Sequence, residues 1–195
     1  MKTNIKYPVS YSQLSSFEFD PEQWYRRYVL KKRDPATPAM EYGKLVGERL
    51  ASDPDFLPKV PRGDIYEYEL NAKLGDVPYI GYIDAYTPHH TLHEYKTSEN
   101  KKRWTQATVD AHTQLDMYAM LLYLQHKVRP EDLTIALTYI PVRRKGDFTY
   151  ECYGEPKTFQ TKRTLSGIMR YATYVEKLLK TMERYACKKQ ADALP

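Results

Sequence analysis

The 195-residue chain is poor in cysteine and contains no long apolar run. Its two cysteines, Cys152 and Cys187, cannot supply the four thiolates that an iron–sulfur cluster needs. Widely spaced cysteines without a signal peptide predict free thiols in a reducing cytosol. No segment approaches the about 20 apolar residues of a membrane span. We therefore expect a cytoplasmic protein without an iron–sulfur cluster and without membrane association.

The sequence also lacks the motifs of several enzyme classes. It has no Ser–His–Asp grouping, no glycine-rich phosphate loop and no Cys-x-x-Cys pair, so acyl transfer and nucleotide hydrolysis have no support. His89 and His90 are adjacent, but they have no third or fourth metal ligand at suitable spacing. His93 neighbours Glu94 and therefore points to the opposite face of a strand. We interpret these three histidines as structural or solvent-facing residues.

Two segments that are present predict a β-hairpin. Residues 79–84 and 92–97 alternate in polarity and are rich in β-branched and aromatic side chains. Residues 87–91 predict the loop between them, because the proline there cannot donate to a ladder and favours a turn.

This hairpin concentrates charge on one face. If it is centred on His89, Asp84 faces Glu94, and Lys96 shares their face because strand side chains repeat every second residue. Opposed Cβ atoms lie roughly 5 Å apart, where two carboxylates repel by roughly 3 kcal/mol at an effective dielectric constant of about 20. A cation such as Mg²⁺, typically held by one or two carboxylates and substrate phosphates, would relieve that repulsion. The alternative is a solvated hairpin edge on which Lys96 only pairs with Glu94.

The remaining pattern indicates one α/β or α+β domain over residues 1–195. We expect N-terminal helices in residues 1–60, a catalytic sheet and a long helix in 61–155, and a C-terminal helix in 156–195. Ser12 is the expected N-cap of the first helix. The expected helices cover residues 12–17, 20–30, 39–52, 105–127 and 164–188, and the expected strands cover residues 64–74, 79–84, 92–97, 133–141 and 147–153.

Short motifs follow one another between about residue 10 and residue 125. They are Ser-Tyr-Ser-Gln-Leu at 10–14, Asp-Pro-Glu-Gln-Trp-Tyr at 20–25, Gly-Lys-Leu-Val-Gly-Glu at 43–48, Gly-Tyr-Ile-Asp at 81–84, Glu-Tyr-Lys-Thr-Ser at 94–98 and Gln-Leu-Asp-Met-Tyr at 114–118. Their order and spacing resemble the PD-(D/E)XK nucleases, in the RecB-like exonuclease branch. The resemblance implies a restriction-endonuclease-like core, in which a short mixed sheet is flanked by helices.

Two positions depart from the family pattern. Gly47 stands where many relatives carry a metal-binding histidine, and the neighbouring Glu48 is a substitute ligand or simply an exposed helix residue. Asp20 stands where the iron–sulfur members carry a cysteine.

The resemblance implies metal-assisted hydrolysis of DNA. Asp84 and Glu94, with the main-chain carbonyl of Tyr95, would hold Mg²⁺ or Mn²⁺, which activates water and withdraws charge from the phosphate. Lys96 would orient or activate that water and stabilise the developing charge.

Further residues are predicted to contact the substrate. Gln114 and Tyr118 share a helix face and would hold the scissile phosphate or brace the catalytic lysine, and the Tyr118 ring is expected to stack on unpaired bases. Ser12 belongs to the first family motif and is a further expected contact. The basic run at residues 101–103 would contact the phosphate backbone, which a net charge of +5 also favours. The expected phosphate contacts in this run are Lys101, Lys102 and Arg103.

The most favoured function is that of an exonuclease in recombination, repair or phage replication. Its expected partners are DNA and a recombination or replication protein. A structure-specific endonuclease or nickase would use the same residues. A noncatalytic nucleic-acid-binding or assembly protein on the nuclease fold is the other alternative, which the glycine at position 47 favours. Strand polarity, strand number and oligomeric state do not follow from these motifs, and the source could be bacterial, archaeal or phage.

Overall fold

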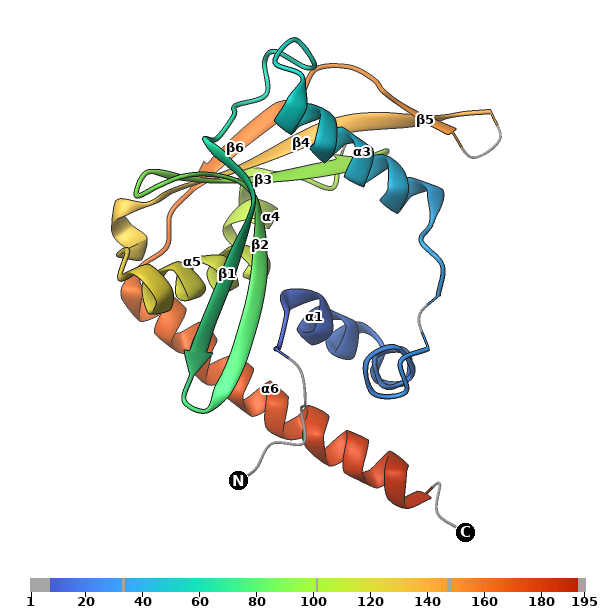
Figure 1. Ribbon diagram of the computed structural model, residues 1–195, viewed down its shortest axis with the longest axis vertical. Helices are drawn as coiled ribbons and strands as arrows, with labels where there is room; N and C mark the ends of the chain where they lie inside the picture. Colours follow the sequence, from blue (N-terminus) through green and yellow to red (C-terminus); the bar gives the residue numbers. More distant parts are fainter. Residues whose placement is uncertain (1–7, 33, 101, 147–148, 193–195) are drawn as a thin grey trace.

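The computed structural model describes residues 8–32, 34–100, 102–146 and 149–192. Within these residues the strands form one mixed sheet, in which β3 and β4 are parallel and the other pairs antiparallel. The strand order is β1 (Ile65–Leu74), β2 (Val77–Thr87), β3 (Thr91–Ser98), β4 (Thr134–Lys145) and β5 (Thr149–Cys152), and β6 (Lys157–Thr161) pairs with β4. The predicted α/β class with a mixed, helix-flanked sheet is confirmed (Figure 1).

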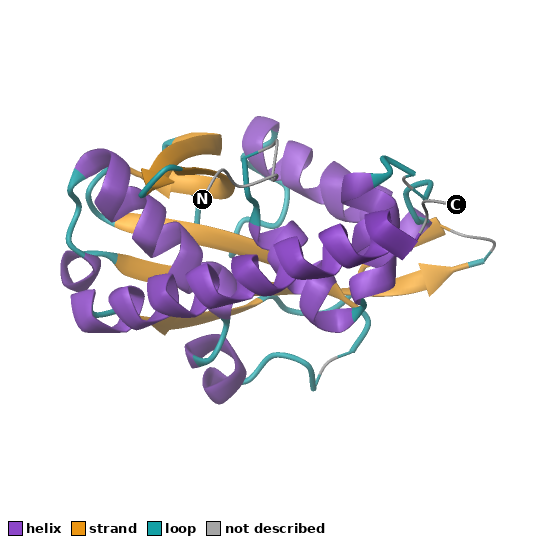
Figure 2. Ribbon diagram, turned by 90° about the horizontal axis from the view of Figure 1, so that it is seen from below, coloured by secondary structure: helices purple, strands orange, loops and turns teal. Residues whose placement is uncertain are grey.

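Helices cover both faces of the sheet (Figures 1 and 2). The main core packs one face against the long helices near the centre and bottom of Figure 1, and a smaller core packs α3 against the other face through Val46, Leu50 and Ile140. The helices are α1 (Tyr11–Phe19), α2 (Pro21–Trp24), the π-helix η1 (Tyr25–Val29), α3 (Pro38–Ser52), α4 (Gln106–Asp110), α5 (Thr113–His126), the 3₁₀-helix η2 (Pro130–Asp132) and α6 (Leu165–Asp192). None of the described helices is long and apolar enough to cross a membrane.

Capping residues fix where the N-terminal helices begin. Asp20 caps α2, since its Oδ1 accepts the N–H groups of Glu22 and Gln23 at 2.9 and 3.0 Å, and a proline follows as predicted. The prediction for α1 was wrong by two residues. Ser10 rather than Ser12 is the cap, because the Oγ of Ser10 accepts the N–H of Gln13.

The prediction of a single helix over residues 105–127 was also wrong. Two helices occupy that range, since α4 ends at Asp110 and α5 begins at Thr113. His112, at the N-cap of α5, has an extended backbone with φ −79° and ψ 104°. Apolar residues continue on both sides of the break, so the sequence period does not reveal it.

The C-terminal part likewise contains more than the expected helix. Residues 157–161 form β6, which pairs antiparallel with the buried strand β4. Only Phe159 of this strand belongs to the main core, so its polar sequence gave no strand signal. The following helix α6 packs its predicted apolar stripe, including Ile168, Val175 and Met182, into the main core. Residues 147–148, part of the strand expected at 147–153, lie outside the described residues.

The two glycines of α3 occupy different surroundings. A Cβ on Gly47 would meet nothing within 4 Å, whereas a Cβ on Gly43 would lie 3.1 Å from Oγ1 of Thr97. Gly43 therefore allows the first half of α3 to approach β3 closely, while position 47 has open space.

We expect Gly47→Ala to raise the free energy of unfolding by about 0.5–1 kcal/mol, because alanine restricts the unfolded chain and favours the helix. Thermal or urea unfolding would measure it. Gly43→Ala on the same helix is the matched control and should gain less or lose stability. Equal gains at both positions would contradict the close approach at Gly43.

Candidate active site

The candidate site forms where β2 and β3 separate. Their paired residues, from Thr87–Thr91 to Ala85–His93, follow the predicted register centred on His89. The pairing ends there, and β3 continues beside β4 instead. The expected Asp84–Glu94 pair at the next position does not form, and Oδ2 of Asp84 instead accepts the N–H of Tyr95 at 2.6 Å. The Asp84 carboxylate thus occupies the place of a main-chain ladder partner.

Glu94 and Lys96 meet beside this junction. Glu94 is only 2 % exposed, and its Oε1 accepts a hydrogen bond from Nζ of Lys96. Its Oε2 is buried and has no hydrogen-bond partner among the described residues. Lys96 also donates to Oε1 of Gln114 at 2.9 Å, and 28 % of its side chain is exposed. The Lys96 side chain is therefore the solvent-exposed part of this pair.

Burial and mutual repulsion set the ionisation of these groups. Burial, with the nearby Glu94 charge, raises the pKa of Asp84 well above its usual value despite the counteracting Lys96. Burial also raises the pKa of Glu94. Burial alone would lower the pKa of Lys96, but Glu94 and Asp84 outweigh it and the pKa is raised. One ammonium therefore does not compensate both carboxylates, and the site favours an additional proton or cation.

Helix α5 supplies the support for the lysine. Nε2 of Gln114 donates to the hydroxyl of Tyr118 at 2.7 Å, so the two predicted residues share one helix face and act together. Tyr118 is 5 % exposed, and a Cβ on Gly81 would lie 3.0 Å from its Cε1. The glycine of the 81–84 motif is thus what lets α5 approach β2. Because its ring is buried, the expected stacking of Tyr118 on bases is wrong.

The donor set fits a hard divalent cation. Asp84 and Glu94 provide carboxylate oxygens, and the buried, unpartnered Oε2 of Glu94 is an orphan that a cation would satisfy. In a strand the N–H and C=O of one residue point to the same side. The Tyr95 carbonyl therefore faces the Asp84 side, where β2 no longer pairs with β3.

The helix side of the predicted metal shell is absent from this structure. Glu48 is exposed on α3, where it pairs with Lys44 at 3.4 Å. No group of three or more His, Cys, Asp or Glu side chains lies together at metal-binding distance in the part of the chain that the structure describes. Glu48 therefore does not join Asp84 and Glu94 in such a group.

The other predicted contacts lie outside the carboxylate cluster. Ser12 is exposed on α1, and Lys102 and Arg103 are exposed in the turn after β3. No hydrogen bond or ion pair among the described residues joins these three to the cluster. Lys101 lies outside the described residues.

Two residues near the site were missed. Glu67 would oppose Asp84 in the β1–β2 register, but its backbone is left-handed, with a φ of 48°. The negative charge of Glu67 contributes to raising the pKa of both Asp84 and Glu94. His112 packs edge-on against Trp104 at 5.2 Å, and burial lowers its pKa to about 4. A left-handed glutamate has no sequence signal. Trp104 lies eight residues before His112, so no local pattern indicated this ring contact.

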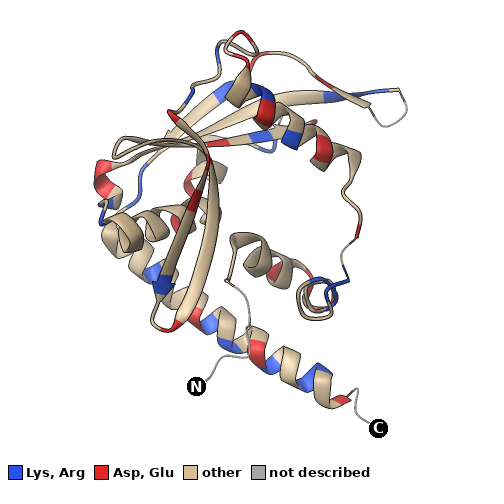
Figure 3. Cartoon of the chain, in the orientation of Figure 1, with Lys and Arg blue, Asp and Glu red and all other residues tan. Residues whose placement is uncertain are grey.

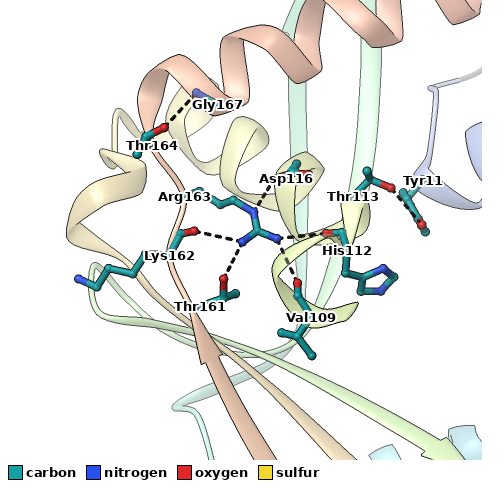
Figure 4. A network of polar contacts seen from close by, with 10 residues as sticks. All are labelled: Tyr11, Val109, His112, Thr113, Asp116, Thr161, Lys162, Arg163, Thr164 and Gly167. Atoms are coloured by element: carbon teal, nitrogen blue, oxygen red, sulfur yellow. Dashed lines mark hydrogen bonds and ion pairs between the residues drawn. The ribbon is translucent and has the colours of Figure 1, made fainter. Parts of the chain in front are cut away.

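Arg163 fixes the N-terminal end of α5 (Figure 4). It is 7 % exposed, and its Nε pairs with Asp116. Nη2 donates to the carbonyls of Val109 and His112 at 3.4 and 3.3 Å, and Nη1 donates to Oγ1 of Thr161 at 2.8 Å. The guanidinium thus takes up carbonyls at the break between α4 and α5. It links the segment that carries Gln114 to the end of β6.

Comparisons with known proteins find likeness at the level of structure. No protein-family profile and no curated protein sequence matches the chain. A candidate exonuclease from Eubacterium rectale superposes with a TM-score of 0.63 at 12% identity, covering 96% of this chain and 86% of the other. The alkaline exonuclease LHK-Exo of Laribacter hongkongensis, in complex with dAMP, gives 0.55 at 12% identity, with 95% and 93% covered. The chain therefore has the fold of these exonucleases.

We expect Arg163→Met to lower the free energy of unfolding by about 3 kcal/mol, because Asp116 and two carbonyls lose a buried partner. Chemical unfolding would measure this. Adding Asp116→Asn should recover part of the loss by removing the unpaired charge. No recovery in the double variant would contradict the assigned pairing.

We expect Asp84→Asn to raise the melting temperature at neutral pH in the absence of divalent metal. The folded wild type holds its carboxyl proton more tightly than the unfolded chain. Its stability therefore falls as pH rises from the ordinary carboxyl range towards the raised pKa of Asp84. The asparagine amide oxygen can still accept the Tyr95 N–H while removing the charge.

Melting curves between pH 4 and pH 8 test this expectation. The gain of the Asn variant over wild type should grow with pH, and Mg²⁺ or Mn²⁺ should stabilise the wild type more than the variant. Asp76→Asn, in the exposed β1–β2 turn, is the control and should show neither effect. A gain independent of pH would contradict the electrostatic explanation.

Proposed function

We propose that this protein is a divalent-metal-dependent deoxyribonuclease, a phosphodiester hydrolase of the RecB-like exonuclease branch of PD-(D/E)XK nucleases. The observation that carries the proposal is the buried cluster of Asp84, Glu94 and Lys96 where β2 and β3 separate. Its position on an exonuclease fold supports the same conclusion.

The residues of the cluster have different roles. Asp84, Glu94 and the Tyr95 carbonyl would hold Mg²⁺ or Mn²⁺. Such a cation, when bound, activates water and withdraws charge from the attacked phosphate. Lys96 stays protonated, since its pKa is raised, and so orients a water molecule and stabilises negative charge on the phosphate rather than accepting a proton.

Gln114 and Tyr118 position the lysine. Gln114 accepts from Lys96 and donates to Tyr118, which fixes the amide orientation. With Glu94 as the other acceptor, one proton of the ammonium remains, in a defined direction. Of the two roles predicted for this pair, the contacts favour bracing the lysine over direct binding of phosphate.

A polyanionic substrate suits the charge of the chain. The net charge is +5, and Figure 3 shows Lys and Arg on the segment after α1 and on the β4–β5 hairpin, on the side where α3 begins. LHK-Exo has been captured with dAMP, a deoxynucleoside monophosphate. We infer DNA as substrate, end-dependent degradation as the mode of action, and a role in recombination, repair or phage replication beside a partner protein.

A noncatalytic nucleic-acid-binding or assembly protein is the second candidate. It is favoured by the absence of a three-ligand group among the described residues and by the open helix position at Gly47. The unpartnered Oε2 of Glu94 argues against it, because a protein without a cation gains nothing from a buried, unsatisfied carboxylate oxygen.

The test is incubation with linear and covalently closed circular DNA, with Mg²⁺, Mn²⁺ or EDTA. We expect metal-dependent loss of linear DNA alone, and a decrease in rate of about 100-fold or more in Asp84→Ala and Lys96→Ala. Nicking of circles would indicate an endonuclease instead.

Exposed residues of the β1–β2 hairpin provide matched controls. Asp76→Ala and Lys73→Ala should cut as fast as the wild type. Undiminished activity in folded Asp84→Ala or Lys96→Ala would refute the assigned site. An absence of cleavage in every condition would leave the binding function.

A further inference from the structure

A cavity of about 300 Å³ lies beyond the end of the catalytic strand. It is bounded by the first half of α3, the end of β3 with the turn that follows, and β5. In Figure 1 these segments lie together on the side of the sheet that α3 covers. The lining side chains that matter here are Tyr42, Thr97, Asn100, Arg103 and Tyr150.

The cavity begins at the residues that follow the catalytic lysine, on the opposite face of the sheet. Thr97 and Ser98 directly follow Lys96, and a strand advances about 3.3 Å per residue. Thr97 also contacts α3, where Gly43 allows the helix close to the strand. Lys96 points to the α5 face of the sheet and Thr97 to the α3 face, so a nucleic acid strand with a phosphate at Lys96 would reach this cavity by passing around the end of β3, beside Arg103.

The lining combines aromatic rings with a cation and one carboxylate, Glu99, whose Oε1 accepts the main-chain N–H of Arg144 at 3.0 Å. The rings of Tyr42 and Tyr150 have centroids 5.9 Å apart and planes inclined at 31°. Arg103 lies over the ring of Trp104 at 5.6 Å and forms no ion pair with a carboxylate among the described residues. Flat π-faces stack on any base, and a guanidinium binds phosphate or stacks in turn.

The volume limits the occupant to a single planar group. Ligand pockets begin at about 300 Å³, which is enough for one base and too small for a base pair with its backbone. Tyr42 is tied to the smaller core, and its hydroxyl lies 3.5 Å from Sγ of Cys152. Tyr150 lies on the short strand β5 and is half-buried.

We propose that this cavity is a subsite for one unpaired nucleobase next to the phosphate being cut. Tyr150 stacks on the base, and Arg103 holds the adjoining phosphate. This inference rests on the proposed nuclease function and adds a preference for a single-stranded or frayed DNA end.

The test is the binding of fluorescent single-stranded DNA in EDTA, where the metal-dependent reaction cannot proceed. Tyr150→Ala should weaken binding about 5- to 100-fold with an unchanged salt dependence, and Tyr150→Phe should bind like the wild type. Arg103→Ala should reduce the slope of log K against log salt by about 0.7. Tyr153→Ala, an exposed tyrosine just past β5 and outside the cavity lining, is the control and should have no effect.

An abasic site moved along the oligonucleotide completes the experiment. At one position it should weaken wild-type binding by the factor seen for Tyr150→Ala and should not weaken the variant further. Because the wild-type scan needs no substitution, it decides the matter even if Tyr150→Ala does not fold. No sensitive position, or the same loss in Tyr153→Ala, overturns the subsite.

Cleavage of linear DNA separates the two ideas. If the wild type cuts linear DNA and the Tyr150 variants bind DNA normally, the subsite is refuted and the nuclease function is supported. If binding depends on a base and on Tyr150 but no DNA is cut, the subsite is supported and the nuclease function is refuted.

Discussion

The hydrogen bond from the Tyr95 N–H to Asp84 is the contact on which the site depends. It lies where β2 stops pairing with β3, so a side chain completes what the main chain leaves open. An unpaired amide at this depth would be costly, and a carboxylate satisfies it only by being buried beside Glu94. The same contact therefore finishes the sheet and creates the excess of negative charge that a cation would relieve.

Much of this centre could be predicted because it is local. The β2–β3 register follows from the turn and from alternation over a few residues. It places Asp84 near Glu94 and Lys96, although the expected Asp84–Glu94 ladder pair does not form. The spacing of Gln114 and Tyr118 likewise fixes a shared helix face. Sequence also indicated the α/β class, because helical and strand periods alternate along the chain.

What sequence did not indicate depends on contacts between distant residues. The break between α4 and α5 is held by Arg163, which lies 47 residues after Asp116. The strand β6 has little apolar sequence and exists because β4 offers it a free edge. The link from Gln114 to Lys96, and the close packing at Gly81, need the folded distance between α5 and the sheet. Glu67 needs a backbone conformation that no residue type announces.

The Arg163 linkage has a consequence for biosynthesis. The β2–β3 hairpin and α5 leave the ribosome well before residue 163, yet the carbonyls at the break between α4 and α5 gain their guanidinium partner only afterwards. Until then the segment that carries Gln114 lacks its anchor, and Lys96 lacks a fixed second acceptor. Under the proposed nuclease function, the complete site would form only after residue 163 has been synthesised.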